Sequence, residues 1–154
     1  PLDKILAQYN IKYNGKGVFF INLLKRDNSS LIYVYRPLKL TKNLSSIAAH
    51  NFLKSYGYKL NDLDSDLNYL KYRFESLQKT PHEIGVFLGY PIWDVKGFID
   101  NKGKDFKYCG TWKVYNNTDY AKIYFKKCKY YTNLYCKLFS LGVPLEYLIL
   151  KNSL

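Results

Sequence analysis

The first half of the chain carries two short hydrophobic runs separated by a turn. Residues 17–24 form the first run, and residues 31–36, rich in β-branched and aromatic side chains, form the second. Between them, residues 27–30 read Asp-Asn-Ser-Ser, a composition typical of turns. Two runs joined in this way predict an antiparallel β-hairpin whose second strand ends at Pro37.

Farther along the chain, hydrophobic residues recur at intervals of three and four, which places them on one face of an α-helix. Leu63, Leu67 and Leu70 are the clearest example. This pattern, with its flanking glycines and prolines, predicts about five helices, over residues 41–56, 63–77, 80–89, 91–101 and 118–141, with a further short candidate over 2–8. Residues 107–115 predict a strand, and the type of the apolar element at 145–150 is left open.

These elements together predict an α+β fold. The expected architecture is a small antiparallel sheet, formed by the N-terminal hairpin and the 107–115 strand, packed with about five helices. The chain has 154 residues, of which 47% are hydrophobic, and no internal repeat or linker-like segment. A chain of this size can bury a core without disulfides or metals, so we expect residues 1–154 to form a single domain.

The segment from Thr80 to Ile99 is the richest in helix-start and helix-stop residues. Thr80, followed by Pro81 and by Glu83 three residues after it, has the pattern of a helix N-terminus closed by a capping box. A second helix is expected to start at Pro91, with the carboxylate of Asp94 in its first turn, where it suits the helix dipole.

Two glycines of the same segment are not explained by helix ends. Gly85 and Gly97 fall inside the expected helices, where each costs on the order of 1 kcal/mol relative to alanine. We therefore expect something to approach the backbone closely at these positions. Packing of another element of the fold is the commoner cause, and a ligand is the alternative.

The net charge is +12, from 24 basic and 12 acidic residues. Such an excess favours a polyanionic partner such as nucleic acid, a nucleotide or an acidic lipid. A compositional explanation is favoured for the charge as a whole, because lysine, asparagine, isoleucine and tyrosine all have AT-rich codons. Arg36 is one of only three arginines, and arginine is the better bidentate phosphate ligand, so Arg36 is a candidate for binding.

The cysteines and the hydropathy indicate a soluble, cytoplasmic protein. Three cysteines without a CxxC pair argue against a disulfide framework and against a zinc site, so we expect no metal and no cofactor. The first residues lack the apolar run of a signal peptide, and the longest apolar run, residues 17–24, is shorter than the roughly 18–20 residues that cross a bilayer. No membrane partner is expected.

A candidate binding site can be assembled around His82, in the first turn of an expected helix. Helix starts expose N–H groups and bind anions readily, and a second helix start follows at Pro91. If both starts face one cleft, the expected ligand-binding residues are His82 together with Arg36, Tyr90, Trp93, Trp112, Lys113 and Tyr115. A structural or merely exposed His82 is the competing interpretation.

Three stretches carry a family resemblance: residues 81–91 (PHEIGVFLGYP), 94–99 (DVKGFI) and 110–115 (GTWKVY). They resemble the signature of an uncharacterised bacterial family, domain-of-unknown-function family 3793. Residues 32–37 and the lysine-rich last helix with Cys128 are similar to it too, so the likeness runs from about residue 30 to the C-terminus. Family members usually carry an earlier cysteine, whereas the first here is Cys109. The resemblance implies a bacterial origin and no particular reaction.

Two functions of different classes remain open. The favoured one is non-catalytic binding or sequestration of a small anionic ligand, with a nucleotide as the leading candidate, because aromatic side chains for stacking accompany the basic ones. The alternative is a hydrolase- or transferase-type enzyme with His82 as general base, oriented by a carboxylate, and Cys109 as nucleophile. Since residues adjacent in a helix do not face each other, Glu83 is a poor partner for His82.

A third function, ranked lower, is nucleic-acid binding through the basic C-terminal helix. The lysines that lie off its apolar stripe would form the binding face: Lys122, Lys126, Lys127 and Lys129. No zinc finger, GxxG loop or RNP-type motif accompanies them, and such a face is more often simply solvated. Self-association into a homo-oligomer also stays open.

Overall fold

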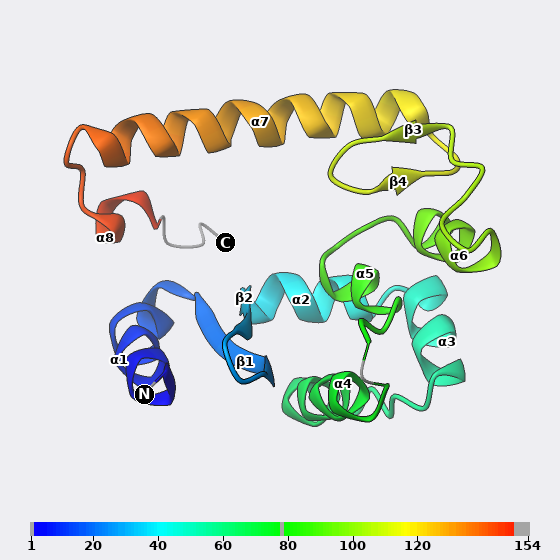
Figure 1. Cartoon of the computed structure of the whole chain (residues 1–154), viewed down its shortest axis with the longest axis horizontal. Coiled ribbons are helices and arrows are strands. Elements are labelled where there is room, and N and C mark those ends of the chain that lie inside the picture. The colour runs from blue at the N-terminus through cyan, green and yellow to red at the C-terminus, as the bar shows by residue number, and fades with distance from the viewer. Residues whose placement is uncertain (1, 78, 150–154) are drawn as a thin grey trace. The chain divides into compact units, whose positions relative to one another are not determined.

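The computed structural model describes residues 2–77 and 79–149 and divides them into two compact units. Unit 1 contains the described residues up to Gly89, and unit 2 contains residues 90–149. Within the described residues, each unit has helices and one small antiparallel sheet (Figure 1). The predicted α+β fold with a small antiparallel sheet is confirmed. The expectation that residues 1–154 form a single domain stays a prediction.

Unit 1 is built around the predicted β-hairpin. Strands β1 (Phe19–Lys25) and β2 (Ser30–Tyr35) pair antiparallel, and a bulge interrupts the register between Asn22 and Leu24. The helical elements of unit 1 are α1 (Leu2–Tyr13), the 3₁₀ turn η1 (Asn14–Lys16), α2 (Pro37–Leu44), α3 (Ile47–Ser55), α4 (Leu63–Leu77) and α5 (Ile84–Phe87). Helix α4 packs against β1 through the predicted apolar stripe, of which Leu67 and Leu70 are buried.

The single helix predicted over residues 41–56 is two helices in the structure. Helix α2 begins with Pro37 at its first position, where the missing N–H costs nothing, so Thr41 lies inside this helix and does not start one. Helix α3 is started by Ser46, whose side-chain oxygen accepts a hydrogen bond from the Ala49 N–H at 3.3 Å. The helix then stops as predicted at Gly57, which has a left-handed backbone with φ of +93°.

Unit 2 contains α6 (Ile92–Asp100), β3 (Tyr108–Cys109), β4 (Lys113–Val114), α7 (Thr118–Ser140) and α8 (Leu145–Leu148). Residues 107–115, predicted as one strand of the N-terminal sheet, are instead a tight hairpin in which β3 pairs with β4. The chain reverses at Gly110, whose N–H donates to the Trp112 carbonyl oxygen at 3.1 Å. The element of open type is the short α8, and residue 150 of its range lies outside the described residues.

The core of unit 2 forms where the β3–β4 hairpin lies against the first part of α7 (Figure 1). Trp112, Val114 and Ala121 are buried there, and the ring of Phe125 meets Trp112 edge-on at 4.5 Å. A Cβ atom at Gly110 would lie 2.3 Å from that Phe125 ring, so only glycine allows this close approach. The later turns of α7 leave large apolar side chains such as Tyr130 and Phe139 exposed.

In the part of the chain that the structure describes, none of the helices is both long enough and apolar enough to cross a membrane.

Candidate functional site

Arg36 lies at the junction of β2 and α2 in unit 1. Its backbone is extended (φ −114°, ψ 114°), and Pro37 after it opens the helix, so the residue is placed by the change from strand to helix. The guanidinium Nη1 donates to the Lys16 carbonyl oxygen at 2.9 Å. A guanidinium carries five N–H groups, so it can be held by a carbonyl and bind an oxyanion at the same time.

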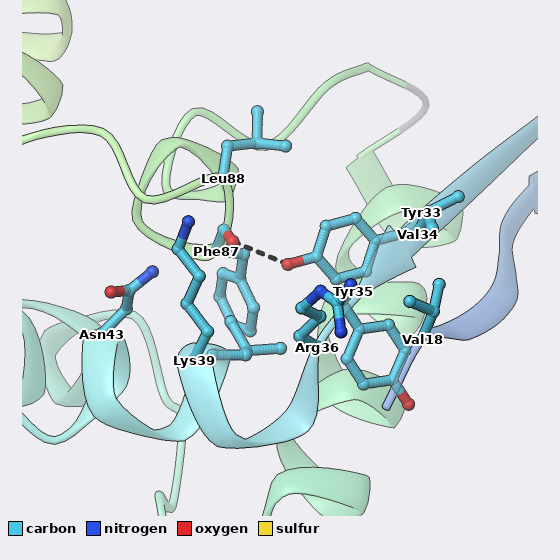
Figure 2. A pocket seen from close by; sticks show the side chains of 10 residues that line it. Val18, Tyr33, Val34, Tyr35, Arg36, Lys39, Asn43, Phe87 and Leu88 are labelled. Atoms are coloured by element: carbon cyan, nitrogen blue, oxygen red, sulfur yellow. Dashed lines mark hydrogen bonds between the residues drawn. The ribbon is translucent and has the colours of Figure 1, made fainter. Parts of the chain in front are cut away.

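A cavity of about 330 Å³ opens beside Arg36 and lies entirely within unit 1. Figure 2 shows its walls, which come from β2, the first two turns of α2 and the end of α5. We call it the basic pocket. Its lining residues are Val18, Tyr33, Val34, Tyr35, Arg36, Lys39, Leu40, Asn43, Phe87 and Leu88.

The polar side chains of the basic pocket share one face of α2. Lys39 and Asn43 follow Arg36 by three and seven residues, the spacing of a single helical face. In Figure 2 the Lys39 side chain extends from α2 towards Leu88. No aspartate or glutamate is among the described residues that line the pocket. Because the first N–H groups of a helix also attract anions, the pocket has the electrostatic character of an anion site.

The wall of the basic pocket that β2 forms is aromatic. The rings of Tyr33 and Tyr35 stack at 5.4 Å with their planes 6° apart. The Tyr33 hydroxyl donates to the Phe87 carbonyl oxygen at 2.6 Å, which ties β2 to α5 (Figure 2). Burial raises the pKa of Tyr33, with a smaller contribution from Tyr35, so the hydroxyl stays a neutral donor. This wall therefore offers aromatic rings, one of which is held to α5 by a hydrogen bond.

The capping box predicted for Thr80 and Glu83 is wrong. Helix α5 begins only at Ile84, and no side-chain hydrogen bond caps it. Glu83 is instead 1% exposed, and its Oε1 accepts from Arg73 Nε of α4 at 2.7 Å and from the Tyr58 hydroxyl at 3.5 Å. The glutamate is thus a buried ion-pair partner that fixes the chain before α5 onto α4.

Asp94 lies in the first turn of α6, as predicted, but its carboxylate mainly accepts hydrogen bonds from another part of unit 2. The side chain is 3% exposed, and both carboxylate oxygens are used. Oδ1 accepts from the N–H groups of Tyr115 at 2.8 Å and Asn116 at 3.1 Å, and Oδ2 accepts from Trp112 Nε1 at 2.8 Å. Asp94 therefore holds the β3–β4 hairpin onto α6.

Most of the predicted ligand-binding residues belong to unit 2 and make packing contacts there. Tyr90 stacks on Trp112 with ring centroids 4.9 Å apart. Lys113 Nζ donates to the Gly103 carbonyl oxygen at 2.7 Å, and its ammonium also lies 4.8 Å from the centre of the Phe106 ring.

The ring of Tyr115 packs against Gly97, where a Cβ atom would lie only 2.5 Å from it. Close packing therefore explains the glycine inside α6, as the commoner of the two expected causes. Trp93 stands apart from these contacts, because it is 46% exposed on α6. Of the seven predicted ligand-binding residues, Arg36 alone lines the basic pocket.

The two candidate catalytic residues belong to different units. His82 is an exposed residue in the turn before α5 of unit 1, and Cys109 is an exposed residue of β3 in unit 2. The catalytic alternative therefore stays a prediction. The same holds for nucleic-acid binding, for which the four candidate lysines of α7, Lys122, Lys126, Lys127 and Lys129, are exposed. Among the described residues, no group of three or more histidines, cysteines and carboxylates could hold a metal ion.

Sequence reasoning missed most of the basic pocket. Lys39 and Asn43 were not singled out, because the helix was predicted to start at Thr41, which hides their spacing from Arg36. Reading Pro37 as a first helical residue, and not only as the end of a strand, would have revealed it.

The fold and the basic pocket define an α+β protein with a cavity at the start of a helix, lined by Arg36 and Lys39. The chain belongs to the family described as "Protein of unknown function (DUF3793)", which matches residues 2–149. The match confirms the resemblance noted in the sequence. No curated protein and no solved structure matches the chain.

Proposed function

We propose that this protein binds or sequesters a small anionic ligand in the basic pocket, and that the ligand is a mononucleotide. The observation that carries the proposal is the pairing of Arg36 and Lys39 in a cavity that no described carboxylate lines. Two cations three residues apart, one just before α2 and one in its first turn, match a phosphate or diphosphate group.

The size and the walls of the pocket favour a nucleotide over a bare inorganic anion. A volume of about 330 Å³ is at the lower end of the range for small-molecule sites, which suits one nucleotide and not a dinucleotide. Tyr35, Phe87 and Leu88 supply an apolar surface for a base, and the Asn43 amide offers a donor and an acceptor for its edge.

Binding without catalysis is part of the proposal. The described residues of the pocket include no histidine, cysteine or carboxylate, which are the usual general acids, bases and nucleophiles. We also place the protein in the bacterial cytoplasm, since the cysteines Cys109, Cys128 and Cys136 are free thiols and such thiols persist in a reducing compartment.

Isothermal titration calorimetry with AMP, ADP and ATP tests the proposal. Arg36→Ala and Lys39→Ala are each expected to weaken binding of the best ligand by roughly ten-fold or more, because each removes a charge-assisted hydrogen bond. Lys42→Ala is the matched control, since Lys42 is an exposed lysine of the same helix outside the pocket lining.

Wild-type affinity in both Arg36→Ala and Lys39→Ala would contradict this site assignment. Native mass spectrometry of the protein as purified would, in addition, detect a nucleotide carried through purification. His82→Ala is expected to leave the affinity unchanged, because His82 does not line the pocket.

A further inference from the structure

A second cavity in unit 1 has the opposite electrostatic character. It has a volume of about 370 Å³ and lies among α2, α3 and the start of α4. Its polar lining residues are Thr41, Ser45, His50, Asn61, Asp62 and Asp66, and no lysine or arginine is among the described residues that line it. We call it the acidic cavity. In a chain of net charge +12, His50 is therefore the one basic side chain among the described residues of this lining.

Asp66 is the buried acceptor of the acidic cavity. It is 4% exposed, and its Oδ1 accepts from the Leu60 N–H at 3.0 Å, which holds Leu60 in a left-handed conformation with φ of +58°. Its second oxygen, Oδ2, has no hydrogen-bond donor among the described residues. This oxygen is not among the described buried side-chain atoms that lack a partner, so it is accessible from the cavity that Asp66 lines.

The surroundings of Asp66 disfavour its negative charge. Burial raises the pKa of Asp66, and nearby Asp62 adds to this effect, whereas the Leu60 N–H and His50 oppose it. A cation placed in the cavity would offset the loss of hydration that burial imposes on the carboxylate.

The arrangement suits an organic cation better than a metal ion. Asp62, Asp66 and His50 do not form a group that could hold a metal, so their donor atoms do not converge on one point. They are spread around a cavity whose apolar walls are leucine side chains, which can pack against methylene groups.

We propose that the acidic cavity is a binding site for a small alkyl diamine. One ammonium group binds Asp66 Oδ2, the other binds Asp62, and the methylene chain lies on Leu44, Leu60 and Leu63. This site is separate from the basic pocket and does not depend on the proposed nucleotide binding.

Titration with 1,4-diaminobutane, followed by calorimetry, tests this site, with 1,4-butanediol as an uncharged probe of the same length. We expect saturable binding of the diamine and none of the diol. Asp66→Asn is expected to weaken diamine binding by about ten-fold or more, because it removes the charge while the amide oxygen can still accept from the Leu60 N–H. Asp62→Asn is expected to weaken it as well, at a more exposed position.

Asp27→Asn is the matched control, because Asp27 is an exposed aspartate of the hairpin turn outside the cavity. Arg36→Ala is expected to bind the diamine like the wild type, which separates this site from the basic pocket. Absence of saturable diamine binding, or equal affinity in the wild type, Asp66→Asn and Asp62→Asn, would overturn the proposal. Circular dichroism spectra confirm that each variant is folded.

Discussion

Asp94 shows how one carboxylate can define the local structure of a whole unit. It is a side chain of α6, yet its three hydrogen-bond donors all come from the β4 region. Glu83 acts similarly in unit 1, where it joins the chain before α5 to Arg73 of α4. In the sequence both residues fitted the simpler pattern of helix starts. An acidic residue shortly after a proline can cap a helix or can accept hydrogen bonds from a distant element. The sequence pattern is the same in both cases, so it cannot separate these two roles.

We predict that Asp94→Ala lowers the free energy of unfolding by about 3 kcal/mol or more, since each buried donor left without a partner costs about 1–3 kcal/mol. Asp100→Ala, at the exposed end of the same helix, is expected to change it by less than about 0.5 kcal/mol. Urea unfolding followed by tryptophan fluorescence measures both. An Asp94→Ala protein as stable as the Asp100→Ala protein would contradict this role.

At the scale of elements, the sequence predicted what depends on local pattern and missed what depends on neighbours. The hairpin β1–β2 and the helix α4 follow directly from hydrophobic spacing, and both are confirmed. The β3–β4 hairpin was predicted as a single strand, because its turn fits only through contact of Gly110 with Phe125, which is 15 residues farther along the chain. Most of the basic pocket was missed because the start of α2 was misplaced by four residues.

The glycine inside α6 offers a test of this packing. Alanine normally stabilises a helix relative to glycine by about 1 kcal/mol. At position 97, however, the Cβ atom of an alanine would overlap the ring and the Cβ atom of Tyr115. We therefore expect Gly97→Ala to destabilise the protein by about 1–3 kcal/mol. Thermal unfolding gives the sign of the effect.

Gly15→Ala provides the control for that measurement, because a Cβ atom there meets no atom within 4 Å. It is expected to leave the stability unchanged or slightly higher. If Gly97→Ala also raised the stability, the Tyr115 contact could not be the reason for glycine in α6.

At the scale of the whole molecule, burial is distributed unevenly between the two units. Most of the buried hydrophobic side chains among the described residues lie in unit 1, whereas unit 2 contributes Val95, Trp112, Val114 and Ala121. Helix α7 has 23 residues, of which Ala121 alone is buried among those described. Length therefore does not make α7 the most stable element.

We predict that native-state hydrogen exchange is slowest in α4 and markedly faster in residues 130–140 of α7, because protection follows burial and packing and not helix length. Mass spectrometry of peptides after timed labelling measures both regions. Protection of residues 130–140 equal to that of α4 would contradict the prediction, since it would show that this part of α7 is covered in solution.

The basic pocket is tested most directly by locating a bound nucleotide on the chain. The measurement is a titration of ¹⁵N-labelled protein with ADP, followed by amide chemical shifts. We predict saturable shifts that are largest at residues 36–43 and 87–88. The first range includes Arg36 and Lys39, and the second lines the pocket from the end of α5. The absence of saturable shifts, or shifts concentrated on the lysines of α7, would contradict nucleotide binding in this pocket.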